Sequence, residues 1–126
     1  MKKLLYTFLI ILTTSVYAEW TPVSKSINGD MYYVDTDRIR KIDGSVYYWQ
    51  LNNYFEADRW GDLSNLYYYK ADCKLFRKKA LRGTFHTGPM ATGETSTIID
   101  EPKDAWVYPS PGSNDENTLN YICSYD

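Results

Sequence analysis

The sequence predicts an α+β domain: a single antiparallel β-sheet of about five to six strands, with a C-terminal helix packed on it and tied by one disulfide. Three observations support this prediction. Several tyrosine-rich segments alternate with a period of two, turn signals containing glycine separate them, and a helix-capping sequence precedes an apolar stripe near the C-terminus. The chain also holds 13 tyrosines, a residue that suits half-buried sheet positions.

The first residues carry the features of an export signal. Met1-Lys2-Lys3 is positively charged, residues 4–12 are apolar, and Val16-Tyr17-Ala18 resembles a small-residue cleavage site. We therefore expect residues 1–18 to be a signal peptide and residues 19–126 to be the mature domain. The apolar run is too short to cross a hydrocarbon core of about 30 Å, so no membrane span is expected. An uncleaved N-terminal anchor is the alternative.

The mature chain opens with a predicted hairpin. Asn28 and Gly29 form a tight-turn signal between the short segments 20–23 and 31–34, and the second of these is rich in strand-forming residues. Asp35 then offers a capping side chain for a single helical turn through residues 38–40.

The clearest strand covers residues 45–57, directly after the turn signal Asp43-Gly44. Its odd positions are mostly aromatic or aliphatic, whereas polar residues such as Gln50 and Asn52 lie on the even positions. A period of two is typical of a strand with one buried face. With two residues of the C-terminal helix, the odd face gives the expected core: Tyr47, Trp49, Leu51, Phe55, Leu119 and Ile122.

Two more strands are expected before the sequence becomes irregular. Residues 65–73 continue the strand pattern, and residues 75–85 resume it, with a bulge or bend expected at Gly83. The pattern does not decide whether residues 72–74 form a turn or a kink within one long strand. Residues 88–111 are rich in Pro, Asp, Glu and Thr and lack periodicity, so they are expected to form loops.

A short helix is predicted over residues 114–123. Ser113 and Glu116 have the spacing of a capping box, and Leu119, Ile122 and Cys123 follow at offsets that place them on one apolar stripe. A helix of this length is marginal by itself. It therefore needs contacts with the sheet.

Cys73 and Cys123 are the only two cysteines, so they allow one intramolecular disulfide. Such a bridge closes a loop of about 50 residues, which the chain-entropy treatment values at about 4 kcal/mol. Free thiols or an intermolecular bridge remain open from the sequence. A metal site is not expected, because two cysteines and one histidine at these spacings match no zinc pattern.

Charge and motif content exclude several classes of protein. Without Lys2 and Lys3, 12 of the 14 basic residues remain against 16 acidic ones, a poor balance for a general nucleic-acid binder. The sequence contains no phosphate-binding glycine loop, EF-hand or Gly-x-Ser-x-Gly motif, so neither a cofactor nor an enzyme activity is expected. The single histidine, His86, is expected to face solvent at a strand end.

One basic cluster stands out in this acidic chain: Lys74, Arg77, Lys78, Lys79 and Arg82. Strict alternation places Arg77 and Lys79 on one face of a strand and the other three on the opposite face. Two interpretations follow. The cluster forms a site for a polyanion or protein partner, or its charges protect an exposed edge strand from aggregation.

A series of motifs covers nearly the whole predicted mature chain in a fixed order: Trp20, Tyr32-Tyr33-Val34-Asp35, Arg38-Ile39-Arg40, Val46 to Trp49, Asn53-Tyr54, Asp72-Cys73, Gly88-Pro89-Met90-Ala91-Thr92-Gly93, Trp106, Pro111-Gly112-Ser113 and Cys123. In this order and spacing the chain resembles the surface-adhesin protein E family of small exported proteobacterial proteins. The resemblance implies an antiparallel sheet with a helix packed on it, and a disulfide from Cys73 to the last helix. It carries over no binding residues.

The resemblance also implies a function. We expect an exported, non-catalytic interaction module with a protein partner, and host extracellular-matrix proteins are the version that the family suggests. The alternative is a soluble periplasmic structural or envelope accessory protein without a host ligand, and a hydrolase built around His86 is a third possibility. A lipoprotein adhesin needs a cysteine after its signal, whereas Ala18 is followed by Glu19. We therefore expect a periplasmic or secreted protein that is not a lipoprotein.

Overall fold

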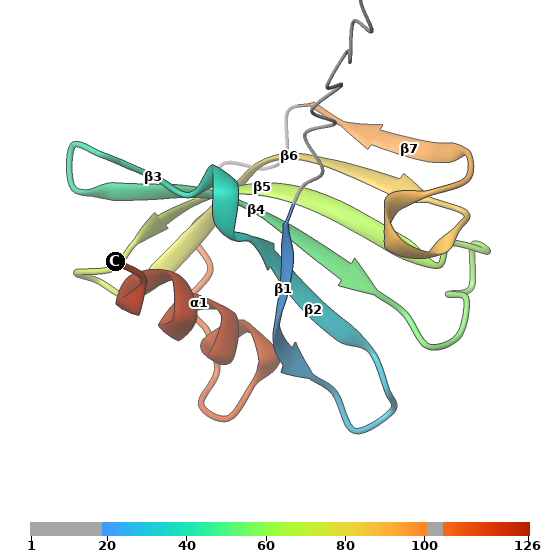
Figure 1. The fold of residues 1–126 in the computed structure, drawn as a ribbon, viewed down its shortest axis with the longest axis horizontal. Coiled ribbons are helices and arrows are strands. Elements are labelled where there is room, and N and C mark those ends of the chain that lie inside the picture. Colours follow the sequence, from blue (N-terminus) through green and yellow to red (C-terminus); the bar gives the residue numbers. More distant parts are fainter. Residues whose placement is uncertain (1–18, 101–104) are drawn as a thin grey trace, which may run out of the picture.

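Seven antiparallel strands and one α-helix form the domain (Figure 1). The computed structural model describes residues 19–100 and 105–126, so the expected signal peptide lies outside the described residues. The strand order is β1-β2-β4-β5-β6-β7, and β3 pairs with the first three residues of β4. The strands are β1 (Trp20–Lys25), β2 (Met31–Asp35), β3 (Arg40–Ile42), β4 (Ser45–Asn53), β5 (Ser64–Asp72), β6 (Arg77–His86) and β7 (Thr95–Ile99). The α+β prediction is confirmed.

The predicted turns lie where the sequence placed them. The β1–β2 hairpin closes at Gly29, whose φ is 97°, and the β3–β4 hairpin closes at Asp43 and Gly44 with φ values of 51° and 80°. Positive φ favours glycine and tolerates aspartate, which explains this turn. Asp35 caps the 3-10 helix η1 (Thr36–Arg38), because its Oδ1 accepts a hydrogen bond from the Asp37 amide at 3.0 Å.

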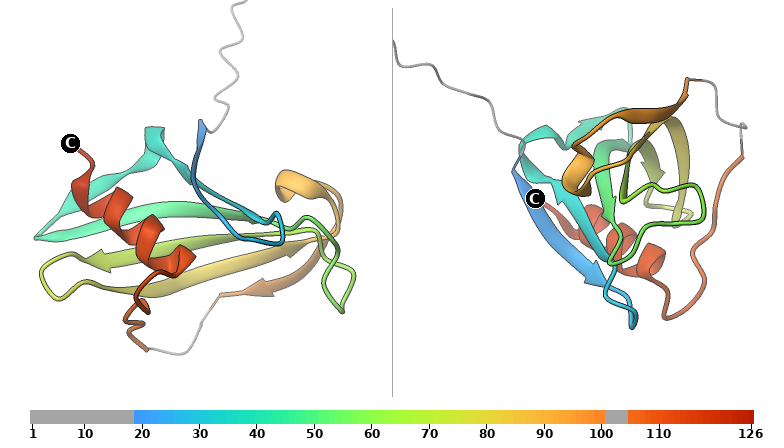
Figure 2. Two further views of the ribbon diagram at one scale, coloured as in Figure 1. Left: turned by 90° about the horizontal axis from the view of Figure 1, so that it is seen from below. Right: turned by 90° about the vertical axis from the view of Figure 1, so that its right-hand side faces the viewer.

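The helix α1 (Asn114–Ser124) lies across one face of the sheet (Figure 2). Ser113 is its N-cap, and its Oγ accepts from the Glu116 amide at 3.1 Å, so the predicted helix start is confirmed. Its apolar stripe closes the core, whose buried members are Val34, Val46, Tyr48, Ala71, Leu119 and Ile122. Burying such side chains contributes about 1.5–3 kcal/mol each for the larger ones.

The core prediction for β4 is wrong about the face of the strand. Val46 and Tyr48, on the even positions, are buried beneath α1, whereas Tyr47 and Trp49 point to the opposite face and are half-buried. Phe55 lies beyond the end of the strand and is 71% exposed. The period of two identified the strand, but aromatic residues line both of its faces, so periodicity could not decide which face the helix covers. Leu51, Leu119 and Ile122 are buried as predicted.

The strand β6 contains a bulge that the sequence placed two residues too late. Tyr69 pairs with Ala80 and the neighbouring Tyr68 pairs with Arg82, so the extra residue is Leu81. Gly83 has a different reason to be glycine. The Tyr67 ring lies over it, and a Cβ at this position would meet Tyr67 Cε1 at 2.5 Å. A larger residue would displace that ring.

Two strands were not expected from the sequence. The strand β3 is short and exposed; Arg40 lies in the segment 38–40 that was expected to be a helical turn, and no element was predicted for residues 41–42. The strand β7 was assigned to a loop, because only Ile98 and Ile99 gave it an apolar signal. Both pair with only one neighbour, so burial gives their sequences no alternating pattern.

A tyrosine row crosses the face of the sheet that carries α1. The Tyr48 and Tyr69 rings stack with centroids 5.5 Å apart, Tyr69 and Tyr67 stack at 5.6 Å, and Phe85 meets Tyr67 edge to face at 6.0 Å. Aromatic pairs of this geometry stabilise a fold beyond their buried area. Burial raises the pKa of Tyr48 well above its usual value, and it also raises the pKa of Tyr69 and Tyr67.

Cys73 and Cys123 form the predicted disulfide, with their Cα atoms 5.5 Å apart. It joins the end of β5 to the last turn of α1. We expect the double variant Cys73→Ser/Cys123→Ser to lose about 4 kcal/mol of unfolding free energy, because the 50-residue loop is no longer closed in the unfolded chain. Urea denaturation measures the difference. Reduced wild-type protein is the control and should match the variant; equal stability of oxidised wild type and variant would contradict the prediction.

The buried tyrosines predict alkaline unfolding. Their folded pKa values lie above the unfolded value of about 10. Their contribution to stability is therefore fully present below about pH 10 and is lost as the pH rises through the folded values. Burial lowers the pKa of Lys78, so the free energy of unfolding gains from this residue as the pH rises from the lowered pKa toward the unfolded value. Tyrosinate absorbance should show a first group that ionises with the fold intact and a second that ionises together with loss of circular dichroism. A single transition of all tyrosines in a folded protein would refute this.

Candidate interaction surface

The structure does not keep the five basic residues of the predicted cluster together. Lys74 lies exposed in the β5–β6 turn, and Lys78 is buried on the face that carries α1. Arg77, Lys79 and Arg82 lie on the opposite face, as their pairing with Asp72, Lys70 and Tyr68 shows. The predicted alternation is wrong for Arg82. The bulge at Leu81 adds one residue, and the strand after it therefore changes face.

Lys78 has a structural position. Its side chain is 2% exposed, its Nζ lies 2.7 Å from Asp115 Oδ1 on the first turn of α1, and it lies 4.3 Å from the centroid of the Tyr69 ring. Burial lowers the pKa of Lys78, while Asp115 opposes that shift. This ion pair joins β6 to the N-terminal end of the helix. Lys78 therefore does not face a partner in this conformation.

The outer side of β6 near Lys78 is not a free edge. Lys78 and Val107 exchange both backbone hydrogen bonds, at 3.0 and 2.8 Å, and β7 pairs with the other end of the strand. Trp106 lies beside the same strand, with the Arg77 guanidinium 4.0 Å and Lys79 Nζ 5.0 Å from its ring centroid. The interpretation of the cluster as a charged guard on an exposed edge strand is therefore wrong.

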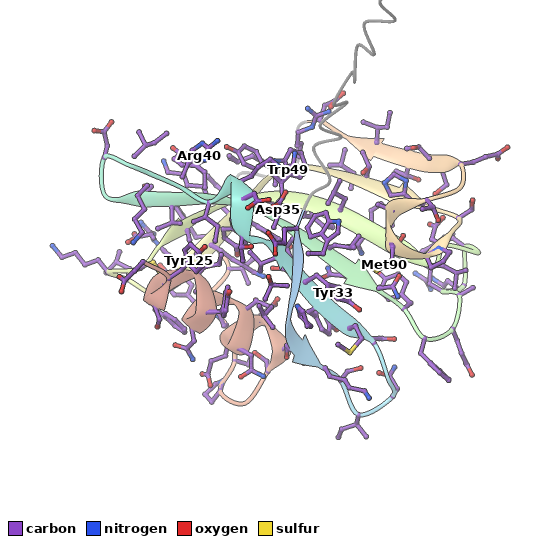
Figure 3. The ribbon with its side chains drawn as sticks, in the orientation of Figure 1. Tyr33, Asp35, Arg40, Trp49, Met90 and Tyr125 are labelled. Carbon is purple, nitrogen blue, oxygen red and sulfur yellow. A yellow bond between two sulfur atoms is a disulfide. The ribbon has the colours of Figure 1, made fainter. Side chains whose placement is uncertain are left out.

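The face of the sheet opposite α1 carries a different cluster, which we call the cationic aromatic patch. It combines the aromatic side chains of β4 and β5 with basic side chains on three strands, β3, β5 and β6: Arg40, Tyr47, Trp49, Tyr68, Lys70, Lys79 and Arg82. Figure 3 shows Arg40 and Trp49 near η1, apart from Tyr125 at the end of α1. The described strands β1, β2, β4 and β7 and the 3-10 helix η2 (Pro89–Ala91) contribute no basic residue to it.

The aromatic rings form the centre of the patch. Trp49 stacks on Tyr68 with centroids 4.8 Å apart, and Tyr47 lies 6.2 Å from Tyr68. All three are half-buried. The Arg38 guanidinium lies 5.5 Å from the Trp49 ring centroid and pairs with the fully buried Asp35.

Basic side chains surround these rings. Lys70 Nζ lies 5.9 Å from the Tyr47 centroid, and Arg40 pairs across from Tyr47 on β3. Among the described residues neither Arg40 nor Lys70 forms an ion pair, and Arg82 has only a long contact of 3.9 Å with the exposed Asp100. A local excess of positive charge thus lies on a chain whose net charge is −2.

His86 is buried rather than solvent-facing, so that expectation is wrong. Its Nε2 lies 2.8 Å from Thr84 Oγ1, and its Nδ1 lies 3.5 Å from Thr95 Oγ1. Both partners are threonine hydroxyls on β6 and β7. The imidazole ring therefore contacts both strands, and this position does not support a hydrolase activity built around His86.

Within residues 19–100 and 105–126, no group of three or more His, Cys, Asp or Glu side chains is arranged to hold a metal ion. In the same part of the chain, no helix is long and apolar enough to cross a membrane.

These features define a class of protein: a small disulfide-linked domain in which one helix covers one face of an antiparallel sheet and leaves aromatic and basic side chains on the other. The chain belongs to the surface-adhesin protein E family, whose sequence model matches residues 20–124. The family resemblance seen in the sequence is thereby confirmed.

Solved structures of Haemophilus influenzae protein E have the same fold. The crystal form II structure is 18% identical over 87% of this chain and 91% of its own, with a TM-score of 0.64. A second structure of that protein is 17% identical, with 87% of each chain covered and a TM-score of 0.60. A third, from a non-typeable strain, is 17% identical over 87% of this chain and 78% of its own, with a TM-score of 0.58. No curated protein matches this sequence.

Sequence reasoning missed the patch because most of its members are distant along the chain. Arg40, Lys70 and Arg82 belong to three different strands, and only the strand register brings them to one face. One signal was present: Tyr47 and Trp49 lie two residues apart on the odd positions of the predicted strand 45–57. Their face was assigned to the core because aromatic residues are more often buried.

The positions of Lys78 and Arg82 predict effects of very different size for the same charge reversal. Lys78→Glu places a carboxylate in a buried site beside Asp115, so we expect it to destabilise the fold by at least about 3 kcal/mol. Arg82→Glu is the matched control, and its exposed position predicts a change within about 0.5 kcal/mol. Urea denaturation of both variants gives the comparison. If Lys78→Glu is as stable as Arg82→Glu, the buried ion pair is not present in solution.

Proposed function

We propose that this chain is an exported, non-catalytic interaction module whose cationic aromatic patch binds an acidic surface of a protein partner. Host extracellular-matrix proteins are the partner class that the family description, surface adhesin, suggests. Residues 1–18 are the export signal in this proposal, and residues 19–126 are the mature periplasmic or secreted domain.

One observation carries the proposal: on the face of the sheet opposite α1, stacked aromatic rings are surrounded by basic side chains. A sheet face that contacts only water normally carries small polar side chains and charged side chains of both signs. Here Trp49 and Tyr68 keep part of their ring surface accessible, and Arg40 and Lys70 have no ion pair among the described residues. Tyr, Trp and Arg are the residues that most often supply binding energy in protein interfaces.

The charge distribution supports an acidic partner surface. A positive patch on an acidic chain attracts a negative partner and disfavours most other surfaces, which gives specificity more than affinity. Of the five residues in the predicted basic cluster, Lys79 and Arg82 also lie on this face. Arg77 lies there too, but it pairs with Asp72. Lys79 and Arg82 extend the patch toward β6.

Binding to immobilised heparin, as a generic polyanion, and to a panel of matrix proteins tests this function. Wild-type protein should bind at about 150 mM salt and more weakly as salt rises, since exposed charges are screened over about 8 Å. The variant Arg40→Glu/Arg82→Glu should bind at least about tenfold more weakly, because two exposed basic side chains of the patch become repulsive.

The control carries the same change in net charge away from the patch. Lys25→Glu/Lys74→Glu reverses two exposed lysines at the end of β1 and in the β5–β6 turn, and it should bind within about twofold of wild type. Equal loss in both variants would mean that net charge rather than the patch governs binding. Absence of any binding would favour the periplasmic structural or envelope accessory protein without a host ligand.

A further inference from the structure

The β4–β5 loop, residues 54–63, projects from one end of the sheet (Figure 2). A groove lies beside this loop. Two adjoining cavities of about 610 and 420 Å³ form it, and Trp60 and Phe85 line both. Each cavity is within the size range of ordinary ligand sites. The groove is separate from the cationic aromatic patch, because Phe85 contacts Tyr67 on the face that carries α1.

Aromatic side chains form the walls of this groove. Tyr54 and Phe85 are half-buried, whereas Phe55 and Trp60 remain 71% and 70% exposed although they line the first cavity. Large apolar side chains exposed side by side at a cavity are typical of binding sites.

Among the described residues, the charged side chains that line the two cavities are all acidic. Asp30, Glu56 and Asp58 line the first cavity and Asp62 lines the second. Burial raises the pKa of Tyr54 to about 12, and the nearby carboxylate of Asp58 contributes to that shift. Carboxylates and aromatic ring faces attract the same kind of group, which is a cation.

The loop is held in place by its own hydrogen bonds. Asp58 Oδ1 accepts from the Trp60 and Asp62 amides at 3.0 and 2.9 Å, and Asp30 Oδ1 accepts from the Phe55 amide at 3.0 Å. A site fixed in this way requires little ordering when a ligand binds.

The Trp60 ring already contacts a cationic side chain of its own loop. The Arg59 guanidinium of the same loop lies 4.0 Å from the Trp60 ring centroid. A guanidinium or ammonium group from another molecule would meet the same ring and, unlike Arg59, would also meet the carboxylates that line the cavity.

We propose that this groove binds a basic linear segment of a protein partner, with an arginine or lysine side chain in the 610 Å³ cavity among Trp60, Tyr54 and Glu56. The second cavity accommodates a neighbouring side chain of the same segment. Two cavities that share Trp60 and Phe85 exceed what a single small cation needs, and their walls combine charge with apolar surface. Both properties match the mixed chemistry of an arginine or lysine side chain.

Nuclear magnetic resonance titration of the ¹⁵N-labelled domain tests the proposal, with the peptide acetyl-Ala-Arg-Ala-Arg-Ala-Lys-Ala-amide as the probe. At about 150 mM salt we expect the largest amide shifts at Asp30, in the 54–62 segment and at Phe85. A peptide of the same length with Glu in place of Arg and Lys should cause none. Absence of shifts at about 1 mM of the basic peptide, or shifts confined to another surface, overturns the proposal.

The variant Glu56→Gln/Trp60→Ala removes one exposed carboxylate and one exposed ring, and neither side chain makes a hydrogen bond among the described residues. It should weaken peptide binding at least about tenfold. Glu94→Gln removes an exposed carboxylate outside the groove and should change binding by less than about twofold. Equal binding by the groove variant would show that general attraction to an acidic protein explains the shifts.

Two other occupants are outcomes of the same experiment. If arginine amide alone binds as tightly as the peptide, the groove is a small-cation site and the segment proposal fails. If dilution of the free protein shifts the same amides, a second copy of this chain occupies the groove and the proposal also fails. Both outcomes are independent of the cationic aromatic patch, whose variants are tested separately.

Discussion

The attachment of α1 to the sheet is the constraint on which the rest of this structure depends. An 11-residue helix is marginal alone, yet Leu119 and Ile122 supply the buried contacts that close the core over Val34 and Tyr48. Two links hold it. The Cys73–Cys123 disulfide joins its last turn to β5, and the Lys78–Asp115 ion pair joins its first turn to β6. Because the links lie at opposite ends of the helix, they fix its direction across the strands.

The position of the helix divides the sheet into surfaces of different chemistry. The face beneath α1 holds the tyrosine row, whose hydroxyls are largely withdrawn from water, and the buried Tyr48 hydroxyl has no hydrogen-bond partner among the described residues. Within the part of the chain that the structure describes, no α-helix packs on the opposite face, and there the aromatic side chains lie among basic ones. One helix on a seven-stranded sheet therefore creates both a core and an open surface.

Positive and negative side chains also lie on different surfaces of the domain. Positive side chains gather on the open face around Tyr47 and Tyr68, whereas carboxylates gather at the end groove around Trp60. In both places the rings and the charges are neighbours, so each surface offers apolar area and electrostatic selection together. A chain with a net charge of only −2 thus presents two surfaces of opposite sign.

Local chemistry determined much of this protein from the sequence alone. The glycine and aspartate turns, the Asp35 and Ser113 caps, the C-terminal helix and the single disulfide follow from residues that are adjacent or have only one partner. The covered face of β4, the extra strands β3 and β7 and the burial of His86 did not, because aromatic residues on both faces and short one-sided strands leave no distinct period.

Only the tertiary structure decided where the basic residues lie. A bulge at Leu81 moves Arg82 to the face of Lys79, and the helix buries Lys78 on the other face. Neither effect has a sequence signal: a bulge depends on the register with the partner strand, and the burial of Lys78 depends on a carboxylate 37 residues away. The sequence therefore determined the elements of this fold and their junctions, whereas strand register and helix placement determined its surfaces.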